Sequence, residues 1–181
     1  ELTQARKYQQ QQLAIARELL TSAIATDFVS SLEAIGLDPT QDLVGADLSQ
    51  FDLRNASLSR ANLEGANLYQ ATLKGSCLYR TNLARAYLRE ANLSVAEMWK
   101  IDLGQANLEE TDLSDANLNG AYLWKAKLAI ANLKGAYLKD VNLVQCDLWR
   151  ANLRGAYLIG ANLHGADLKG ACLERAKYND K

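Results

Sequence analysis

The residues that could carry out chemistry in this chain are few and scattered. His164 is the only histidine, and Glu109, Glu110, Asp112 and Asp115 form a small acidic cluster. A histidine can act as a general base, and paired carboxylates in a cleft can share acid–base work. However, His164 has no second histidine to complete a metal site, and the chain contains no glycine-rich phosphate loop and no Ser/His/Asp set. We therefore expect no catalytic residue, no metal and no cofactor, and we do not expect an enzyme.

The cysteines give no stronger signal. Cys77, Cys146 and Cys172 lack the spacings of metal-binding or redox motifs. We expect no disulfide bridge among them, and Cys146 should behave as a small hydrophobic residue.

The histidine, the acidic cluster and the cysteines all lie within one region of short repeats, and the structure of that region must position them. Residues 46–175 form 26 consecutive units of five residues (130/5), with the pattern Ala-(Asn/Asp)-Leu-x-x and no insertion. Leucine holds the third position in every unit except one, where Met98 replaces it. Such a strict period predicts a repeat architecture. Alanine holds the first position in 19 units, and the exceptions are Phe51, Ser76, Thr81, Ile101, Thr111, Val141 and Cys146.

A period of five fits neither regular secondary structure. On a helix, residues five apart differ by about 140°, so the leucines would point in all directions. On a continuous strand, a step of five moves the side chain to the other face. The chain must therefore turn within each unit, and the Asn or Asp at the second position is expected to stabilise that turn through local hydrogen bonds.

The pattern resembles the pentapeptide-repeat family, including its cyanobacterial members, over Gln41 to about Lys177. The resemblance implies an all-β solenoid: a right-handed quadrilateral β-helix with four units per coil, about 6.5–7 coils in this chain. It also implies that the leucine and the first-position residue face inward and the other three positions face outward. Most glycines occupy the fifth position and should mark corners.

Helical periodicity is confined to the first forty residues. Leu13, Ala16, Leu20, Ile24 and Phe28 recur at steps of three and four residues, which predicts an apolar stripe on one kinked helix or on two helices that end near Gly36. We expect residues 1–40 to be an N-terminal helical cap and residues 41–181 to be the β-helix, because solenoid ends need covering. The alternative is that this helical segment binds a partner.

Outward aromatic residues are the best candidates for function. With four units per coil, Tyr79 and Trp99 should stack on one face, and a second group should lie on the neighbouring face. Exposed Trp and Tyr in a contiguous patch favour protein contact, whereas the alternative is that they only pack along the sheet. The candidate interaction patch consists of Tyr79, Trp99, Tyr137, Tyr157, Ile159, Tyr122 and Trp124.

The C-terminal coil is a second candidate contact. Leu173 and Tyr178 occupy leucine positions there, and an uncovered coil favours pairing with a second copy. The resemblance points the same way, since some members of the family dimerise through this end.

Charge separates the possible functions. The chain carries 20 Lys and Arg against 21 Asp and Glu, and residues 46–175 carry 15 against 14, a net of about +1. We therefore expect no nucleic-acid partner, and no apolar run is long enough to cross a membrane. The prediction is a non-catalytic structural or protein-interaction scaffold with an unidentified protein partner.

The alternative function, which the resemblance suggests, is a DNA mimic that binds DNA gyrase or topoisomerase. Family members of that kind have strongly acidic rods, whereas Arg60, Arg80 and Lys100 here form a basic column. A cytoplasmic location is expected, or the thylakoid lumen or periplasm if a signal was removed before Glu1.

Overall fold

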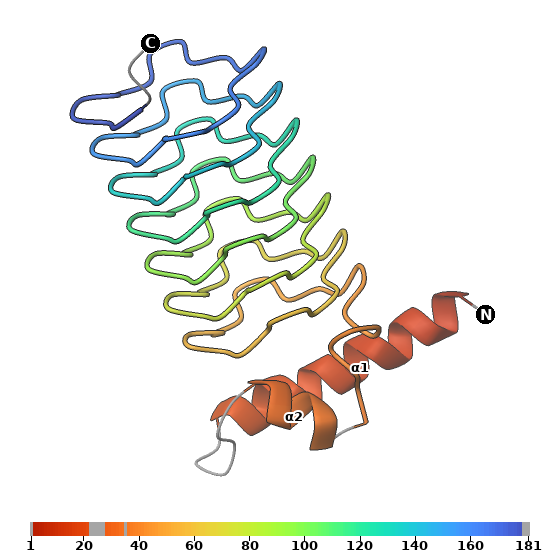
Figure 1. Cartoon of the computed structure of the whole chain (residues 1–181). Helices are drawn as coiled ribbons and strands as arrows, with labels where there is room; N and C mark the ends of the chain where they lie inside the picture. The colour runs from red at the N-terminus through yellow and green to blue at the C-terminus, as the bar shows by residue number, and fades with distance from the viewer. Residues whose placement is uncertain (1, 22–27, 35, 179–181) are drawn as a thin grey trace.

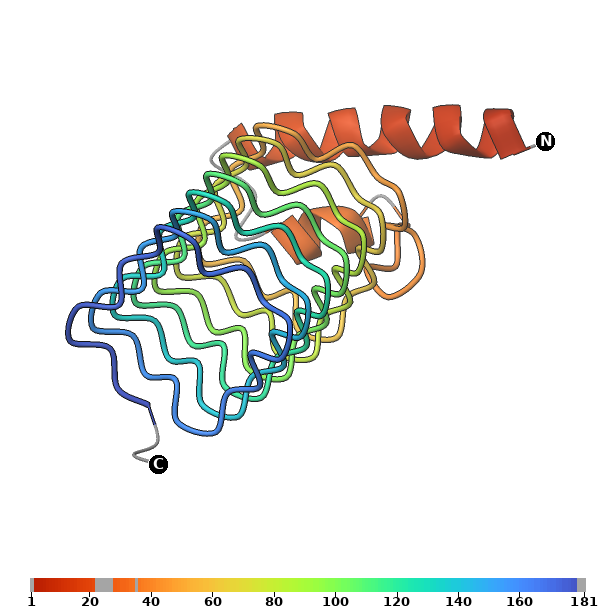
Figure 2. The ribbon, with the colours of Figure 1, turned by 90° about the horizontal axis from the view of Figure 1, so that it is seen from above.

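The computed structural model describes residues 2–21, 28–34 and 36–178 and contains two helices followed by a stack of coils (Figure 1). Helix α1 spans Leu2–Thr21 and helix α2 spans Phe28–Ala34. Both helices lie at the N-terminal end of the stack, and the coils follow one another with a shared outline (Figures 1 and 2). Of the two helical arrangements predicted, the pair of helices is therefore the one observed.

Helix α2 ends at Ala34, close to Gly36, where the sequence predicted the end of the helical segment. Gly36 has a φ of 78°, and its N–H donates to the carbonyl of Glu33 at 3.0 Å. The N–H of Leu37 donates to the carbonyl of Leu32 at 2.9 Å. These two bonds and the left-handed glycine form a Schellman motif, which satisfies carbonyls that the helix end would otherwise leave unpaired.

Parallel β-bridges define the coils. Each bridge joins second-position residues twenty apart, from Asp47↔Asn67 to Tyr157↔Lys177. A step of twenty residues corresponds to four units of five, so each coil has four sides and the same side recurs in every coil. Along one of these sides Asn62, Asn82 and Asp102 form a column, which Tyr122 interrupts.

Every backbone N–H of a typical unit has a partner, which explains the repeat. In the unit that begins at Thr81, the first N–H donates to the leucine carbonyl three residues earlier, the second to the preceding coil, and the third and fifth to the following coil. The fourth, on Ala84, donates to Oδ1 of Asn82 at 3.0 Å. A short Asn or Asp at the second position thus satisfies the one N–H that no other backbone group reaches.

The fifth position always adopts a left-handed conformation. Its φ lies between 52° and 76° from Gly45 to Arg175, as the second central residue of a type II turn requires. The prediction that glycine marks the corners was therefore incomplete, since 18 non-glycine residues share this conformation. Val95 and Ile130 are β-branched and are the most strained of them.

The interior is formed by the first and third positions. Leu103 in the middle of the rod is 0% exposed, and a fully buried leucine contributes roughly 1.5–3 kcal/mol. Phe51 is the large exception at the first position and is 4% exposed. Its ring meets the ring of Phe28 in α2 edge-on, with centroids 5.9 Å apart. Helix α2 therefore accommodates this ring.

Polar residues at the first position use a common acceptor. The hydroxyl of Thr81 donates to the carbonyl of Leu58 at 2.7 Å, 23 residues earlier, and Thr111 and Cys146 make the equivalent bond at 2.9 and 2.7 Å. Ser76 is also buried, but its hydroxyl has no partner among the described residues. A leucine carbonyl at the turn can therefore accept a buried hydroxyl or thiol from the next coil.

Residues of the helical segment join the same core. Leu13, Phe28 and Leu32 are buried in one cluster with the leucines of the coils. Ile24 of the predicted stripe lies outside the described residues, as do the side chains of Ala16 and Leu20. Within the described part of the chain, no helix has both the length and the apolar character needed to cross a bilayer.

Candidate functional site: an aromatic surface interrupted by a hollow

Two aromatic rings at the fourth position form the first part of the predicted patch. Tyr79 and Trp99 stack with their centroids 3.7 Å apart and their planes 26° apart. Trp99 remains 37% exposed, whereas Tyr79 is half-buried because Trp99 covers it. The guanidinium of Arg80 also lies 5.2 Å from the centre of the Tyr79 ring. The predicted stack therefore exists, with Trp99 as its more exposed member.

A second stack uses the second position on the same side of the rod. The rings of Tyr137 and Tyr157 lie 5.0 Å apart and are nearly parallel, at 10°. Nζ of Lys177 lies 4.4 Å from the centre of the Tyr157 ring and continues the column. Tyr137 is exposed, and so is Ile159 two residues beyond Tyr157. The patch thus has two separate aromatic groups.

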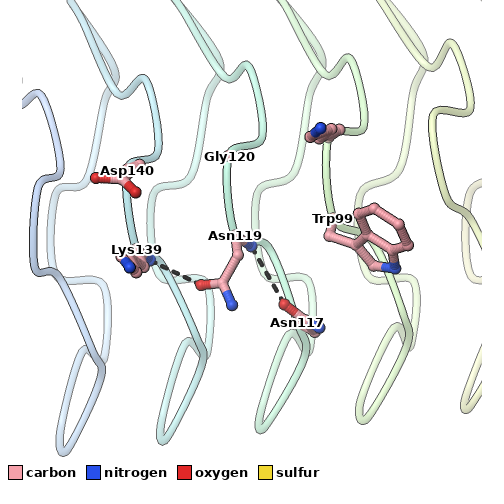
Figure 3. A pocket seen from close by; sticks show the side chains of 7 residues that line it. Trp99, Asn117, Asn119, Gly120, Lys139 and Asp140 are labelled. Atoms are coloured by element: carbon pink, nitrogen blue, oxygen red, sulfur yellow. Dashed lines mark hydrogen bonds between the residues drawn. The ribbon is translucent and has the colours of Figure 1, made fainter.

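A hollow of about 350 Å³ lies beside Trp99, along the coil that carries Asn119 and Gly120 (Figure 3). Gly120 has no side chain, and the side chain of Asn119 turns toward the backbone of the next coil. Its Oδ1 accepts the N–H of Lys139 at 2.9 Å, because Tyr137 stands at the second position of that unit and offers no short acceptor. Lys139 and Asp140 form the far wall of the hollow.

Tyr122 and Trp124 lie on the neighbouring side, as predicted. The indole of Trp124 lies directly against Gly104, where an added Cβ would clash with Nε1 at 2.4 Å. Gly104 is the one glycine at a fourth position of the repeat, and its φ is not left-handed. Its role is to make room for the indole. Tyr122 and Trp124 are both exposed, and Nζ of Lys125 lies 5.5 Å from the Trp124 ring.

A sequence model of pentapeptide repeats matches residues 42–78, 66–105, 100–135 and 136–175, with eight copies of the repeat. The chain belongs to the pentapeptide repeat family. A comparison with curated protein sequences finds no match.

Solved structures of pentapeptide repeat proteins resemble the chain. One from the thylakoid lumen of Arabidopsis thaliana shares 32% sequence identity, covers 59% of this chain and 74% of its own, and superposes with a TM-score of 0.56. Rfr23 from the cyanobacterium Cyanothece shares 33% identity over 64% of this chain and 66% of its own, with a TM-score of 0.40. The plasmid-mediated fluoroquinolone resistance protein QnrB1 shares 16% identity over 80% of this chain and 86% of its own, with a TM-score of 0.51. At that identity, QnrB1 supports the fold alone.

The reactive side chains of this pentapeptide repeat protein are dispersed. Within the described ranges, no group of three or more His, Cys, Asp or Glu side chains could hold a metal ion. His164 is exposed, and in the acidic cluster Glu110 is paired with Arg89 at 2.7 Å. Cys146 is buried, and burial raises the pKa of its thiol to about 12, so the reactive thiolate is scarce at neutral pH.

The last described coil exposes residues that are buried elsewhere. Leu173 is 39% exposed and Tyr178 is 64% exposed, although both occupy leucine positions. The structure therefore places the two predicted dimer-contact residues on the surface.

Sequence reasoning missed two features of this surface. The hollow at Asn119 and Gly120 follows from two small outward residues in succession between bulky neighbours, a signal that is visible once the twenty-residue step is known. The second feature is the space above Gly104 that the Trp124 indole occupies. The unusual position of this glycine in the repeat was the signal for it.

Proposed function

We propose that this protein is a non-catalytic interaction scaffold that binds a protein partner through its aromatic patch. The observation that carries the proposal is the pair of ring stacks, Tyr79 with Trp99 and Tyr137 with Tyr157, on one side of a rigid rod. Exposed Trp and Tyr on a fixed backbone supply contact area at a small entropic cost, and such residues dominate protein–protein interfaces. Tyr122 and Trp124 extend the patch to the neighbouring side.

Affinity capture from the native cell tests this proposal. The double variant Trp99→Ala and Tyr137→Ala should lose the partners that the unmodified protein captures. The matched control is Trp149→Ala with Tyr87→Ala, which removes the same residue types from a different side and should retain them. An unchanged set of partners with the first variant would reject the patch.

The detailed architecture belongs to the same proposal. We infer a right-handed helix of about 6.5–7 coils in residues 41–181, closed at its first coil by a helical cap in residues 1–40. The shared core of Phe28, Leu32 and Phe51 supports the capping role. Removing residues 1–40 should expose that core and cause aggregation. If the fragment is instead monomeric and fully stable, the capping role is wrong and the alternative, that the helices bind a partner, is favoured.

We also propose that two copies associate through the C-terminal coil. The exposed Leu173 and Tyr178 support this contact, since an uncovered coil can be closed by a two-fold partner. Light scattering should give the mass of a dimer, and Leu173→Asp should reduce it to that of a monomer. A monomeric mass for the unmodified protein would reject this interface.

Gyrase binding is the less favoured function, because the near-neutral rod does not imitate the dense charge of a DNA duplex. A supercoiling assay tests it, and we expect no inhibition. For the compartment we propose the cytoplasm. The relative from the thylakoid lumen supports the lumen as the alternative. Fractionation of native cells would distinguish the two.

A further inference from the structure

One corner of the rod carries a row of cations, which we call the basic edge: Arg60, Arg80 and Lys100. All three occupy the fifth position on the same side of successive coils. Their backbones are locked in register, because each N–H donates to the following coil, at 2.9, 3.4 and 3.0 Å respectively. All three side chains are exposed. The fold therefore holds like charges next to one another at the spacing of a β-sheet, about 4.8 Å.

Most arginines elsewhere on the described rod have acidic partners, unlike those of the basic edge; the exception is Arg150, whose guanidinium lies over the Trp149 ring. Arg85 pairs with Glu64 at 2.8 Å and Arg89 with Glu110 at 2.7 Å. Among the residues that the structure describes, no carboxylate lies within ion-pair distance of Arg60, Arg80 or Lys100. Like charges directly opposite in a sheet repel each other, so the basic edge gains by meeting an acidic group from outside.

The two carboxylates nearest to Lys100 in the sequence are engaged elsewhere. Oε2 of Glu97 accepts a hydrogen bond from Asn117 at 2.9 Å, and Oδ1 of Asp102 accepts the N–H of Gly104 at 2.9 Å. Neither pairs with the Lys100 ammonium group, which therefore remains available to a ligand.

The basic edge runs directly into the hollow beside Trp99. Trp99 lies on the near wall and Lys139 supplies a further cation on the far wall (Figure 3), and Lys100 is also among the lining residues. From Arg60 to Lys139 the surface spans four coil steps, or about 19 Å at the sheet spacing. An extended peptide covers that length with about six residues at roughly 3.3 Å each.

We propose that the basic edge and the hollow together bind an extended acidic segment of a partner protein. Carboxylates of the segment pair with Arg60, Arg80 and Lys100, and one apolar side chain occupies the hollow. This inference rests on the proposed interaction function and specifies the chemistry of the partner. A nucleic acid fits less well, because binding of a phosphate backbone draws on many cationic contacts, whereas the rod as a whole carries a net charge of only about +1.

The test uses fluorescence anisotropy with the full chain and a labelled peptide of nine glutamates and one central leucine, at low salt. Glutamine already occupies the fifth position at residues 50, 70, 105 and 145, so it suits the turn. The variant Arg60→Gln, Arg80→Gln and Lys100→Gln should weaken peptide binding at least tenfold. The matched control is Arg85→Gln, Lys125→Gln and Arg150→Gln, which removes two arginines and one lysine from the same position on other edges. It should change binding less than twofold.

Equal losses in the two variants, or no loss in either, would overturn the proposal. Tighter binding of a ten-nucleotide single-stranded DNA than of the peptide, at the same salt concentration, would also overturn it. The hollow is tested by Asn119→Tyr, which should abolish the preference for the leucine-containing peptide over decaglutamate. If that preference is absent in the unmodified protein, the hollow has no part in binding and the proposal as stated fails.

Failure here is distinguishable from failure of the proposed function. If partners captured from cells are lost with Trp99→Ala and Tyr137→Ala but retained by the glutamine variant of the basic edge, the scaffold function stands and the acidic partner is wrong. Loss with both variants, and retention by the control variants, supports both.

Discussion

The two ends of the solenoid present the same repeat in different surroundings. In the first coil, Phe51 is buried against Phe28 of α2. In the last described coil, Leu173 and Tyr178 are exposed, although their position in the repeat is that of the fully buried Leu103. The repeat thus assigns a side chain to the interior, but burial depends on a neighbour on each side along the axis. The stability of a stacked repeat protein resides mainly in such interfaces between neighbouring units.

The largest effect should separate the middle of the rod from its last coil. Leu103→Asp places an unpaired carboxylate in the apolar interior. The free-energy cost of burying that charge is comparable to or larger than the free energy of unfolding of a typical domain, about 5–15 kcal/mol. We expect thermal melting to lose its cooperative transition. Leu173→Asp, at the exposed end, should lower the free energy of unfolding of the monomer by only about 1 kcal/mol. Equal effects at the two sites would contradict the comparison.

Phe51→Ala tests the covered end. Removing a buried phenylalanine side chain costs about 3–5 kcal/mol, and here it also removes the ring contact with Phe28. Chemical denaturation should show that loss. Because Phe28 forms the other half of the contact, Phe28→Ala should cause a similar loss, and the double variant should lose less than the sum. Full additivity would show that α2 does not stabilise the first coil.

Thiol labelling compares the two regions without a change of sequence. Cys172 lies exposed in the last coil, and Cys146 is buried with a pKa raised to about 12 by desolvation. We expect Cys172 to react within minutes at pH 8 and Cys146 only after unfolding. A thiol whose pKa is higher in the folded state stabilises the fold fully below its unfolded pKa of about 9. That contribution should disappear as pH rises from about 9 to 12.

The smallest effect concerns the turns. Ile130 is β-branched and has a φ of 61°, so Ile130→Gly removes backbone strain of about 1–2 kcal/mol. The greater freedom of glycine in the unfolded chain offsets part of this gain. We expect the free energy of unfolding to rise by about 0.5 kcal/mol. Gln145→Gly, at an unbranched fifth position, should give no gain, and a gain of the same size would show that branching is irrelevant.

The repeat predicted most of the fold because its five-residue period continues without insertion and leucine holds the third position in every unit but one. The turn role of Asn and Asp and a helical segment ending near Gly36 followed from residue type and spacing, whereas the inward positions followed from the resemblance to the family. The left-handed conformation of fifth-position residues such as Val95 did not, because those side chains are poor indicators of that conformation.

The surface was only partly predictable, because its features depend on pairs of residues in different coils. Tyr79 and Trp99 could be aligned by counting twenty residues, and they do stack. The inward turn of Asn119 required the exchange of hydrogen-bond partners caused by Tyr137 in the next coil. Such contacts arise between side chains twenty residues apart and have no signature within a single unit.

The twenty-residue step of the bridges separates the phase of the surface from that of the interior. Deleting one unit of five residues would leave each remaining leucine pointing inward, yet would rotate every downstream outward side chain by one side of the rod. Deleting four units would shorten the rod by one coil and keep all sides aligned. Surface patterns in such a molecule can therefore be recombined by insertions and deletions, in modules of a quarter turn, with no change to the sequence of the core.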